Sequence, residues 1–177
     1  MISRRSLFGT GAGLGAASIA GVAAAGAAHA DTAPSQGSTS STGSPKSVAR
    51  AFYESYNQRD LDASFARYIA PDAVTHAMDD AFTIADWLAF DKTMVVAFDD
   101  LSMVVLDQIA EGRKVATRFT LGGTQTGEFA GIPASGNVAF LSATAVDRVE
   151  DGQIVEHWVD LDFQAFLQKL SAAPAAE

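Results

Sequence analysis

The stretch TGEFAGIPASGNVAFLSATAVDRVEDGQIVEHWVDLD, residues 126–162, contains two runs that are typical of β-strands. A loop rich in Gly and Pro precedes them, and a turn at residues 150–152 separates them. Because side chains alternate between the two faces of a strand, one face of such a hairpin can wall a cavity while the other packs or meets solvent. On this pattern His157 shares a face with Val155 and Val159. We therefore expect His157 to be buried and to line the main cavity.

Outside this hairpin, the chain predicts helices first and strands afterwards. Apolar residues recur at helical spacing in three early segments, and Ser44 and Pro45 are typical of the start of a helix. The expected helices cover residues 45–57, 61–68, 84–98 and 163–170, and the expected extended segments cover residues 72–77, 102–110, 114–122 and the hairpin. This order predicts an α+β fold: a cone-shaped, curved antiparallel sheet packed against three N-terminal helices, with a short C-terminal helix.

Two parts of the opening stretch, GEFAGIP (residues 127–133) and VEDGQIVEHW (residues 149–158), resemble the SnoaL-like polyketide cyclase and ester cyclase group of the nuclear transport factor 2-like superfamily. The resemblance extends over nearly all of residues 48–170. It implies the same cone-shaped domain, often assembled as a homodimer through the outer face of its sheet. It also implies cofactor-free, intramolecular aldol ring closure of a polyketide ester.

The same resemblance implies a carboxylate on the last strand as the acid/base group and a histidine on the preceding strand beside it. This chain can be aligned on the shared Ile154, His157, Phe163 and Gln164. It then has Val159 at the carboxylate position and Ala145 at the histidine position. Neither side chain titrates. Acid/base chemistry in this chain would therefore need other residues.

Few side chains of the predicted domain can exchange a proton near neutral pH. His157 is the first candidate for a general base, because an imidazole titrates in that range; the alternative is a packed core histidine. Asp160 is a candidate partner if a bulge turns it inward, and His76 is the second imidazole and a further candidate. His76, Asp79 and Asp80 could in principle bind a divalent metal, but a solvated acidic turn is the more common arrangement of such residues. We therefore predict no metal and no cofactor.

The rest of the predicted pocket comes from apolar helix faces and from the strands. Arg118 and Thr144 are candidates to polarise a substrate carbonyl. The complete predicted wall is Phe52, Tyr56, Trp87, Phe90, Met94, Arg118, Thr144 and Val159. Such a wall suits a small, apolar, oxygenated molecule. Two functions stay open: an enzyme of the cyclase, isomerase or lyase type that works by acid/base chemistry, and a non-catalytic ligand-binding or dimerisation module on the same fold.

Residues 1–30 are predicted to be a secretory signal. Arg4 and Arg5 precede an apolar run rich in Ala and Gly that ends in the small-residue sequence at positions 28–30. The paired arginines are typical of a twin-arginine signal, with cleavage expected after Ala30 and export to the periplasm or the extracellular space. A retained membrane anchor is the alternative. Because Gly and Ser interrupt the run and a span takes about 18–20 apolar residues, we expect no stable membrane insertion.

Three further segments follow the predicted signal. Residues 31–44 are a Ser/Thr/Gly/Pro linker expected to be disordered, residues 45–171 are the single domain, and residues 172–177 are a loose tail. Without residues 1–30 the chain has 10 basic and 21 acidic residues, a formal charge of −11, which opposes binding to nucleic acid. The sequence has no cysteine, so it forms no disulfide and carries no thiol nucleophile.

Overall fold

The computed structural model describes residues 43–77 and 82–173. The predicted signal at residues 1–30, most of the predicted linker, Asp79 and Asp80 lie outside the described residues. In chain order the elements are α1 (Pro45–Ser55), the 3-10 turn η1 (Tyr56–Gln58), α2 (Leu61–Tyr68), β1 (Ile69–His76), α3 (Ile84–Ala97), β2 (Ser102–Glu111), β3 (Lys114–Thr124), β4 (Val138–Glu150), β5 (Gln153–Leu161) and α4 (Phe163–Ser171).

The helices begin where local capping chemistry places them. Ser44 caps α1 by accepting a hydrogen bond from the backbone N–H of Ser47, and Pro45 occupies the first turn. Asp60 caps α2 and Asp162 caps α4 in the same way. The carboxylate of Asp162 is therefore used to start a helix. In the described part of the chain, no helix combines the length and the apolar character needed to cross a membrane.

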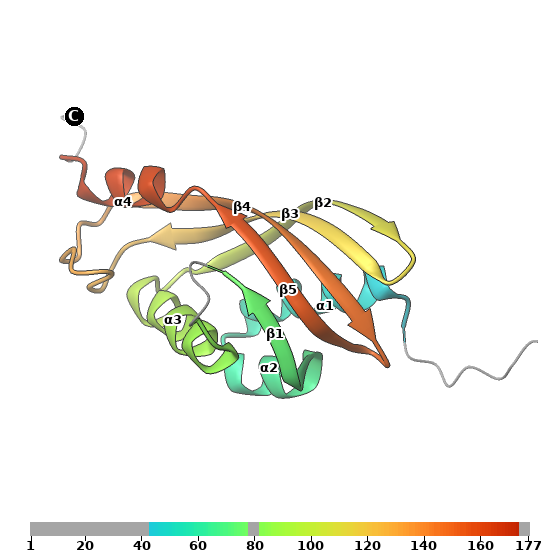
Figure 1. The fold of residues 1–177 in the computed structure, drawn as a ribbon. Coiled ribbons are helices and arrows are strands. Elements are labelled where there is room, and N and C mark those ends of the chain that lie inside the picture. Colours follow the sequence, from blue (N-terminus) through green and yellow to red (C-terminus); the bar gives the residue numbers. More distant parts are fainter. Residues whose placement is uncertain (1–42, 78–81, 174–177) are drawn as a thin grey trace, which may run out of the picture. The chain divides into compact units, whose positions relative to one another are not determined.

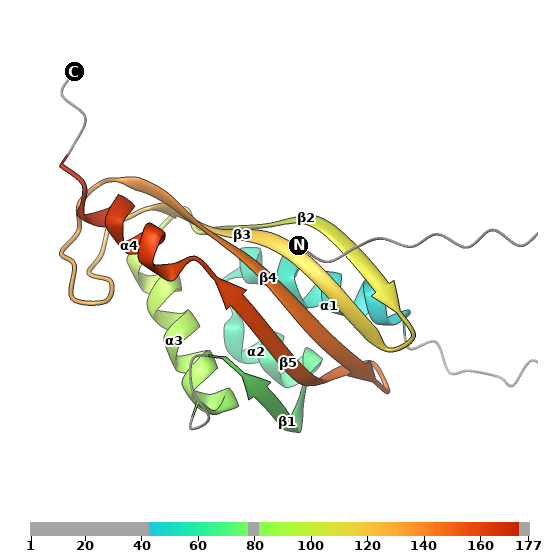
Figure 2. The same cartoon turned by 45° about the horizontal axis from the view of Figure 1, so that its top comes forward.

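All five strands form one sheet in the order β1-β5-β4-β3-β2. Strands β2 to β5 form the expected antiparallel meander, and the α+β fold with its curled sheet is confirmed. Helices α1, α2 and α3 lie on one face of the sheet, and α4 follows directly from β5 (Figures 1 and 2). Strand β1 pairs parallel with β5. The sequence pattern did not predict this pairing, because the two segments are far apart in the chain.

A bulge in β5 decides which of its side chains face the helices. Glu156 and Ile154 pair with consecutive residues of β4, so Val155 is an extra residue on β5. As a result Ile154 and His157 are both buried, although they are three positions apart. The burial expected for His157 is thus correct. Its expected neighbour Val155 is only half-buried, because the bulge interrupts the alternation.

The aromatic core centres on Phe52 of α1, which is fully buried. Its ring meets neighbouring rings edge to face at centroid distances between 5.2 and 6.3 Å. These neighbours are Tyr53, Tyr56, Phe65, Tyr68 and Trp87. Edge-to-face pairs add specific attraction to the burial of apolar surface. This cluster joins α1, α2 and α3 and holds the tyrosines and the tryptophan that reach the sheet.

Candidate active site

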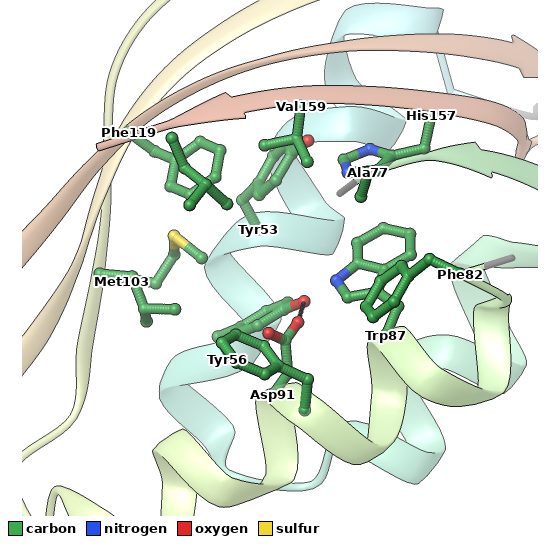
Figure 3. Close-up of a pocket in the computed structure, with 13 residues that line it drawn as sticks. Tyr53, Tyr56, Ala77, Phe82, Trp87, Asp91, Met103, Phe119, His157 and Val159 are labelled. Atoms are coloured by element: carbon green, nitrogen blue, oxygen red, sulfur yellow. Dashed lines mark hydrogen bonds between the residues drawn. The ribbon is translucent and has the colours of Figure 1, made fainter. Parts of the chain in front are cut away.

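The helices and the inner face of the sheet enclose a cavity of about 60 Å³, shown in Figure 3. Most of its wall is aromatic or aliphatic, and neither Lys nor Arg is among the described residues that line it. The lining residues are Tyr53, Tyr56, Ala77, Phe82, Trp87, Phe90, Asp91, Met103, Phe119, Leu121, His157, Val159 and Leu161. Charges in such an apolar space interact more strongly than they do in water.

A buried carboxylate on the neighbouring strand holds His157. Asp147 of β4 lies directly opposite His157 of β5, and its Oδ1 is 2.7 Å from His157 Nδ1. The Tyr53 hydroxyl donates a hydrogen bond of 2.8 Å to Oδ2 of the same carboxylate. Burial, and then the charge of Asp147, raise the pKa of Tyr53 well above its ordinary value. The hydroxyl therefore stays protonated and acts as a donor.

These contacts determine the tautomer of His157. A carboxylate only accepts hydrogen bonds, so Nδ1 carries the proton that is donated to Asp147, and in the neutral imidazole Nε2 holds the lone pair. Among the described residues, no side chain forms a hydrogen bond with Nε2. The indole of Trp87 stacks on the imidazole with a centroid distance of 4.1 Å and an angle of 14°. His157 is thus oriented by two neighbours and has an unengaged basic nitrogen.

A second carboxyl group reaches the cavity from the helices. Asp91 of α3 is 7% exposed, and its Oδ2 accepts a hydrogen bond of 2.6 Å from the Tyr56 hydroxyl. Burial raises the pKa of Asp91 to about 6, while hydrogen bonds from Tyr56 and Trp87 and the positive charge of His157 in its protonated form oppose this increase. Figure 3 shows Asp91 and His157 approaching the cavity from different walls, one from α3 and one from the sheet.

The predicted pocket residues fall into two groups in the structure. Tyr56, Trp87, Phe90 and Val159 line the cavity, as does His157. Two further predicted wall residues, Phe52 and Met94, are almost completely buried and are not part of the lining. They pack behind it in the core.

The structure does not bring the other predicted residues to the cavity. Arg118, Thr144 and Asp160 form one row across β3, β4 and β5 on the outer, exposed face, where they line a separate groove. The bulge in β5 occurs before His157, so strict alternation returns after it and Asp160 points away from the helices. The partnership expected between Asp160 and His157 is therefore replaced by that of Asp147.

His76 also lies on the outer face. Its ring stacks on Trp158 with a centroid distance of 4.8 Å, and its Nε2 is 3.0 Å from Glu156 Oε1. It is therefore not part of the cavity that contains His157. In the described part of the chain, no three His, Cys, Asp or Glu side chains are grouped so that they could hold a metal ion.

Two residues of the site were missed in the sequence, Asp91 and Asp147, and Tyr53 was expected only as apolar wall and core. Asp147 and His157 lie on either side of the turn between β4 and β5 and pair directly across the hairpin. This pairing could have been predicted from the sequence if the bulge had been included in the register. Asp91 follows Trp87 by one helical turn, so its position on the same face could also have been noticed. The burial of both carboxylates depends on segments far away in the sequence.

A protein-family model described as SnoaL-like polyketide cyclase matches residues 46–170. The chain belongs to this family. Solved structures agree with this assignment. AclR from Streptomyces galilaeus, a candidate hydroxylase, is 28% identical, with a TM-score of 0.67 and coverage of 75% of this chain and 84% of AclR. IdmH from Streptomyces antibioticus, a candidate polyketide cyclase, is 33% identical, with a TM-score of 0.63 and coverage of 72% and 99%. No curated protein matches the chain.

This SnoaL-like protein arranges its titratable pair differently from the pattern that the resemblance implies. Ala145 and Val159, at the expected histidine and carboxylate positions, pair with each other across β4 and β5. The next inward-facing pair toward the turn is Asp147 and His157. The carboxylate thus lies on β4 and the histidine on β5, one row away and with the two residue types exchanged.

Changing Asp91 to asparagine should make the protein more stable near neutral pH. Because the pKa of Asp91 is raised to about 6, the protonated form stabilises the fold, and this contribution is lost as the pH rises through about 6. The difference between this pKa and the ordinary value of 3.8 corresponds to about 3 kcal/mol, so the free energy of unfolding of Asp91→Asn should exceed that of the wild type by about 1–3 kcal/mol at about pH 7.5 and by little at about pH 4. Urea unfolding at both pH values measures this. The exposed Asp72→Asn variant is the control; an equal change in both variants would contradict the prediction.

Proposed function

We propose that this SnoaL-like protein catalyses a cofactor-free acid/base reaction on a small, apolar, oxygenated substrate, of the ring-closing type. The observation that carries the proposal is the buried group Tyr53–Asp147–His157 at the wall of an apolar cavity. In this proposal Nε2 of His157 removes a proton from a carbon next to a carbonyl. Val159 and the aromatic residues provide the wall against which the substrate lies.

Asp147 supports this role through both of its oxygens. Its Oδ1 accepts from Nδ1 of His157, which directs the lone pair to Nε2 and stabilises the imidazolium that forms when the base takes a proton. Its Oδ2 is engaged by Tyr53, so the carboxylate is held in place. A packed core histidine usually has both ring nitrogens hydrogen-bonded, whereas Nε2 of His157 has no side-chain partner among the described residues. An oriented imidazole with a free nitrogen beside an apolar cavity favours catalysis.

The size and polarity of the cavity support the proposed substrate class. A space of about 60 Å³ holds the reacting end of a molecule, and its wall has few polar groups to bind a charged one. The sequence has an excess of acidic residues, which also disfavours polyanionic ligands. We therefore place a ketone or ester carbonyl with an adjacent acidic C–H bond next to His157.

Deuterium exchange tests the proposal without knowledge of the natural substrate. Benzyl methyl ketone in heavy water should incorporate deuterium next to its carbonyl faster with the protein than in buffer alone, as measured by proton NMR. Because the proposed base lies in a binding cavity, the exchange rate should saturate as the ketone concentration rises. If the ketone binds, as shown by shifts of the cavity signals, and exchange stays at the buffer rate, the alternative of a non-catalytic ligand-binding module is the better account.

We propose that the protein is a homodimer through the outer sheet face, where Leu106 is exposed and Arg118 and Asp160 lie in one row. A two-fold axis would place Arg118 opposite the partner's Asp160. Light scattering should then show a dimer, and Arg118→Glu should raise the monomer fraction while Lys46→Glu leaves it unchanged. A monomeric wild-type protein would refute this.

Export is proposed from the first 30 residues alone. The paired arginines at positions 4 and 5 and the following apolar run support a twin-arginine signal. Mass spectrometry of the protein from the periplasmic or culture fraction should give an N-terminus at Asp31. An intact N-terminus, or retention in the cytoplasmic fraction, would contradict export with cleavage.

A further inference from the structure

We propose that Asp91 is the second catalytic group of the site and donates a proton to the substrate oxygen on which negative charge develops. This inference rests on the proposed function, in which His157 removes the proton from carbon. Asp91, on the opposite wall of the cavity, then delivers a proton to the substrate oxygen.

The geometry places Asp91 where such a donor is needed. Asp91 belongs to α3 and His157 to β5, and both line the same cavity (Figure 3). Trp87 lies one helical turn before Asp91 and stacks on His157, so the three side chains form a continuous part of the wall. A carbonyl-containing molecule that occupies this space can contact both titratable groups.

The surroundings of Asp91 favour its protonated form. No Lys or Arg is found among the described residues that line the cavity, so no cation there neutralises a carboxylate at this position. Burial shifts the pKa of Asp91 upward, because a carboxylate is costly in apolar surroundings, and this effect outweighs the hydrogen bond that the Tyr56 hydroxyl donates to Oδ2. A purely structural partner for Tyr56 would not need to be ionisable. An asparagine could accept the same hydrogen bond.

The proton balance of a ring closure uses both groups. His157 Nε2 takes the proton from the carbon, and that carbon forms a new C–C bond to a second carbonyl carbon of the same molecule. The C–O π bond opens, its electron pair moves to oxygen, and the Asp91 carboxyl proton is transferred to that oxygen to form a hydroxyl. Asp91 is left as the carboxylate and His157 as the imidazolium. Proton exchange between the two groups or with water restores both, so no oxidant, reductant or cofactor is consumed.

Two reactions separate the role of Asp91 from that of His157. The first is deuterium exchange into benzyl methyl ketone. The second is closure of a β-keto ester whose terminal carbon bears an ortho-acetylphenyl group, followed by the absorbance of the new ring. In Asp91→Asn, closure should fall by about 10²–10³-fold, and the loss should exceed the loss in exchange by at least about tenfold. Asp72→Asn, which changes an exposed carboxylate of β1 outside the cavity, is the matched control and should leave both rates unchanged.

The inference is overturned if closure by Asp91→Asn stays within about tenfold of wild type, or if closure and exchange fall equally. A second measurement does not depend on turnover. The carbonyl stretch of bound benzyl methyl ketone should lie at lower frequency in the wild-type protein than in Asp91→Leu, because a carboxyl donor weakens the C=O bond. Equal frequencies would overturn the role of Asp91 even if exchange occurs. Absence of exchange with a shifted carbonyl band would refute the His157 base alone, and absence of binding would refute both.

Discussion

Replacing His157 by glutamine should reduce deuterium exchange into benzyl methyl ketone by about 10²–10⁴-fold, the range typical of a lost general base. The amide of glutamine can still donate to Oδ1 of Asp147, so the hydrogen bond that is 2.7 Å in the wild type has a replacement. What disappears is a basic nitrogen at the cavity wall. The measurement is the exchange rate at saturating ketone, followed by proton NMR.

The matched control is His76→Gln, because His76 is the other imidazole of the described chain and stacks on Trp158 on the outer face. It should exchange deuterium at the wild-type rate. Asp147→Asn should also lower the exchange rate, because an amide that donates to Nδ1 moves the proton of His157 to Nε2. Retention of at least a third of the wild-type rate in His157→Gln would show that His157 is not the base.

Replacing Phe52 by alanine should cost about 3–5 kcal/mol of the free energy of unfolding, the usual range for removing a fully buried aromatic ring. Phe52 is 0% exposed and contacts five aromatic rings at its edges or face. The free energy of unfolding of a small domain is only about 5–15 kcal/mol, so this change should bring the protein close to unfolding at about 37 °C. Urea unfolding followed by far-UV circular dichroism measures it.

Two variants test the cause of this loss. Phe52→Leu keeps most of the apolar volume and should cost about 1–2 kcal/mol, because it loses the ring contacts but leaves a smaller void. Phe140→Ala removes a phenylalanine that is 38% exposed on the outer face and should cost less than about 1 kcal/mol. A loss below about 2 kcal/mol in Phe52→Ala would mean that the core closes around the missing ring.

Local chemistry in the sequence determined most of the secondary structure. Ser44, Pro45 and Asp60 mark helix starts by capping and by the restricted backbone of proline, and these interactions involve only nearby residues. The turn at Asp151 and Gly152, both with positive φ, is equally local and brings β4 and β5 together. For the same reason the hairpin could be predicted, and the burial of His157 was expected from its apolar neighbours on the strand. The family could be recognised from the sequence of this hairpin and of the loop before it.

Tertiary structure decided which titratable groups meet. The bulge at Val155 sets the register that places Asp147 opposite His157, and Tyr53 reaches Asp147 from a helix 94 residues earlier in the chain. Asp91 becomes a buried acid only because α3 packs against the site, since burial is the main cause of its raised pKa. His76 and Asp160, chosen from residue type and sequence distance, lie on the other face of the sheet. Capping and turn formation depend on neighbours in the chain, whereas burial and pairing of charges depend on which distant segments exclude water together.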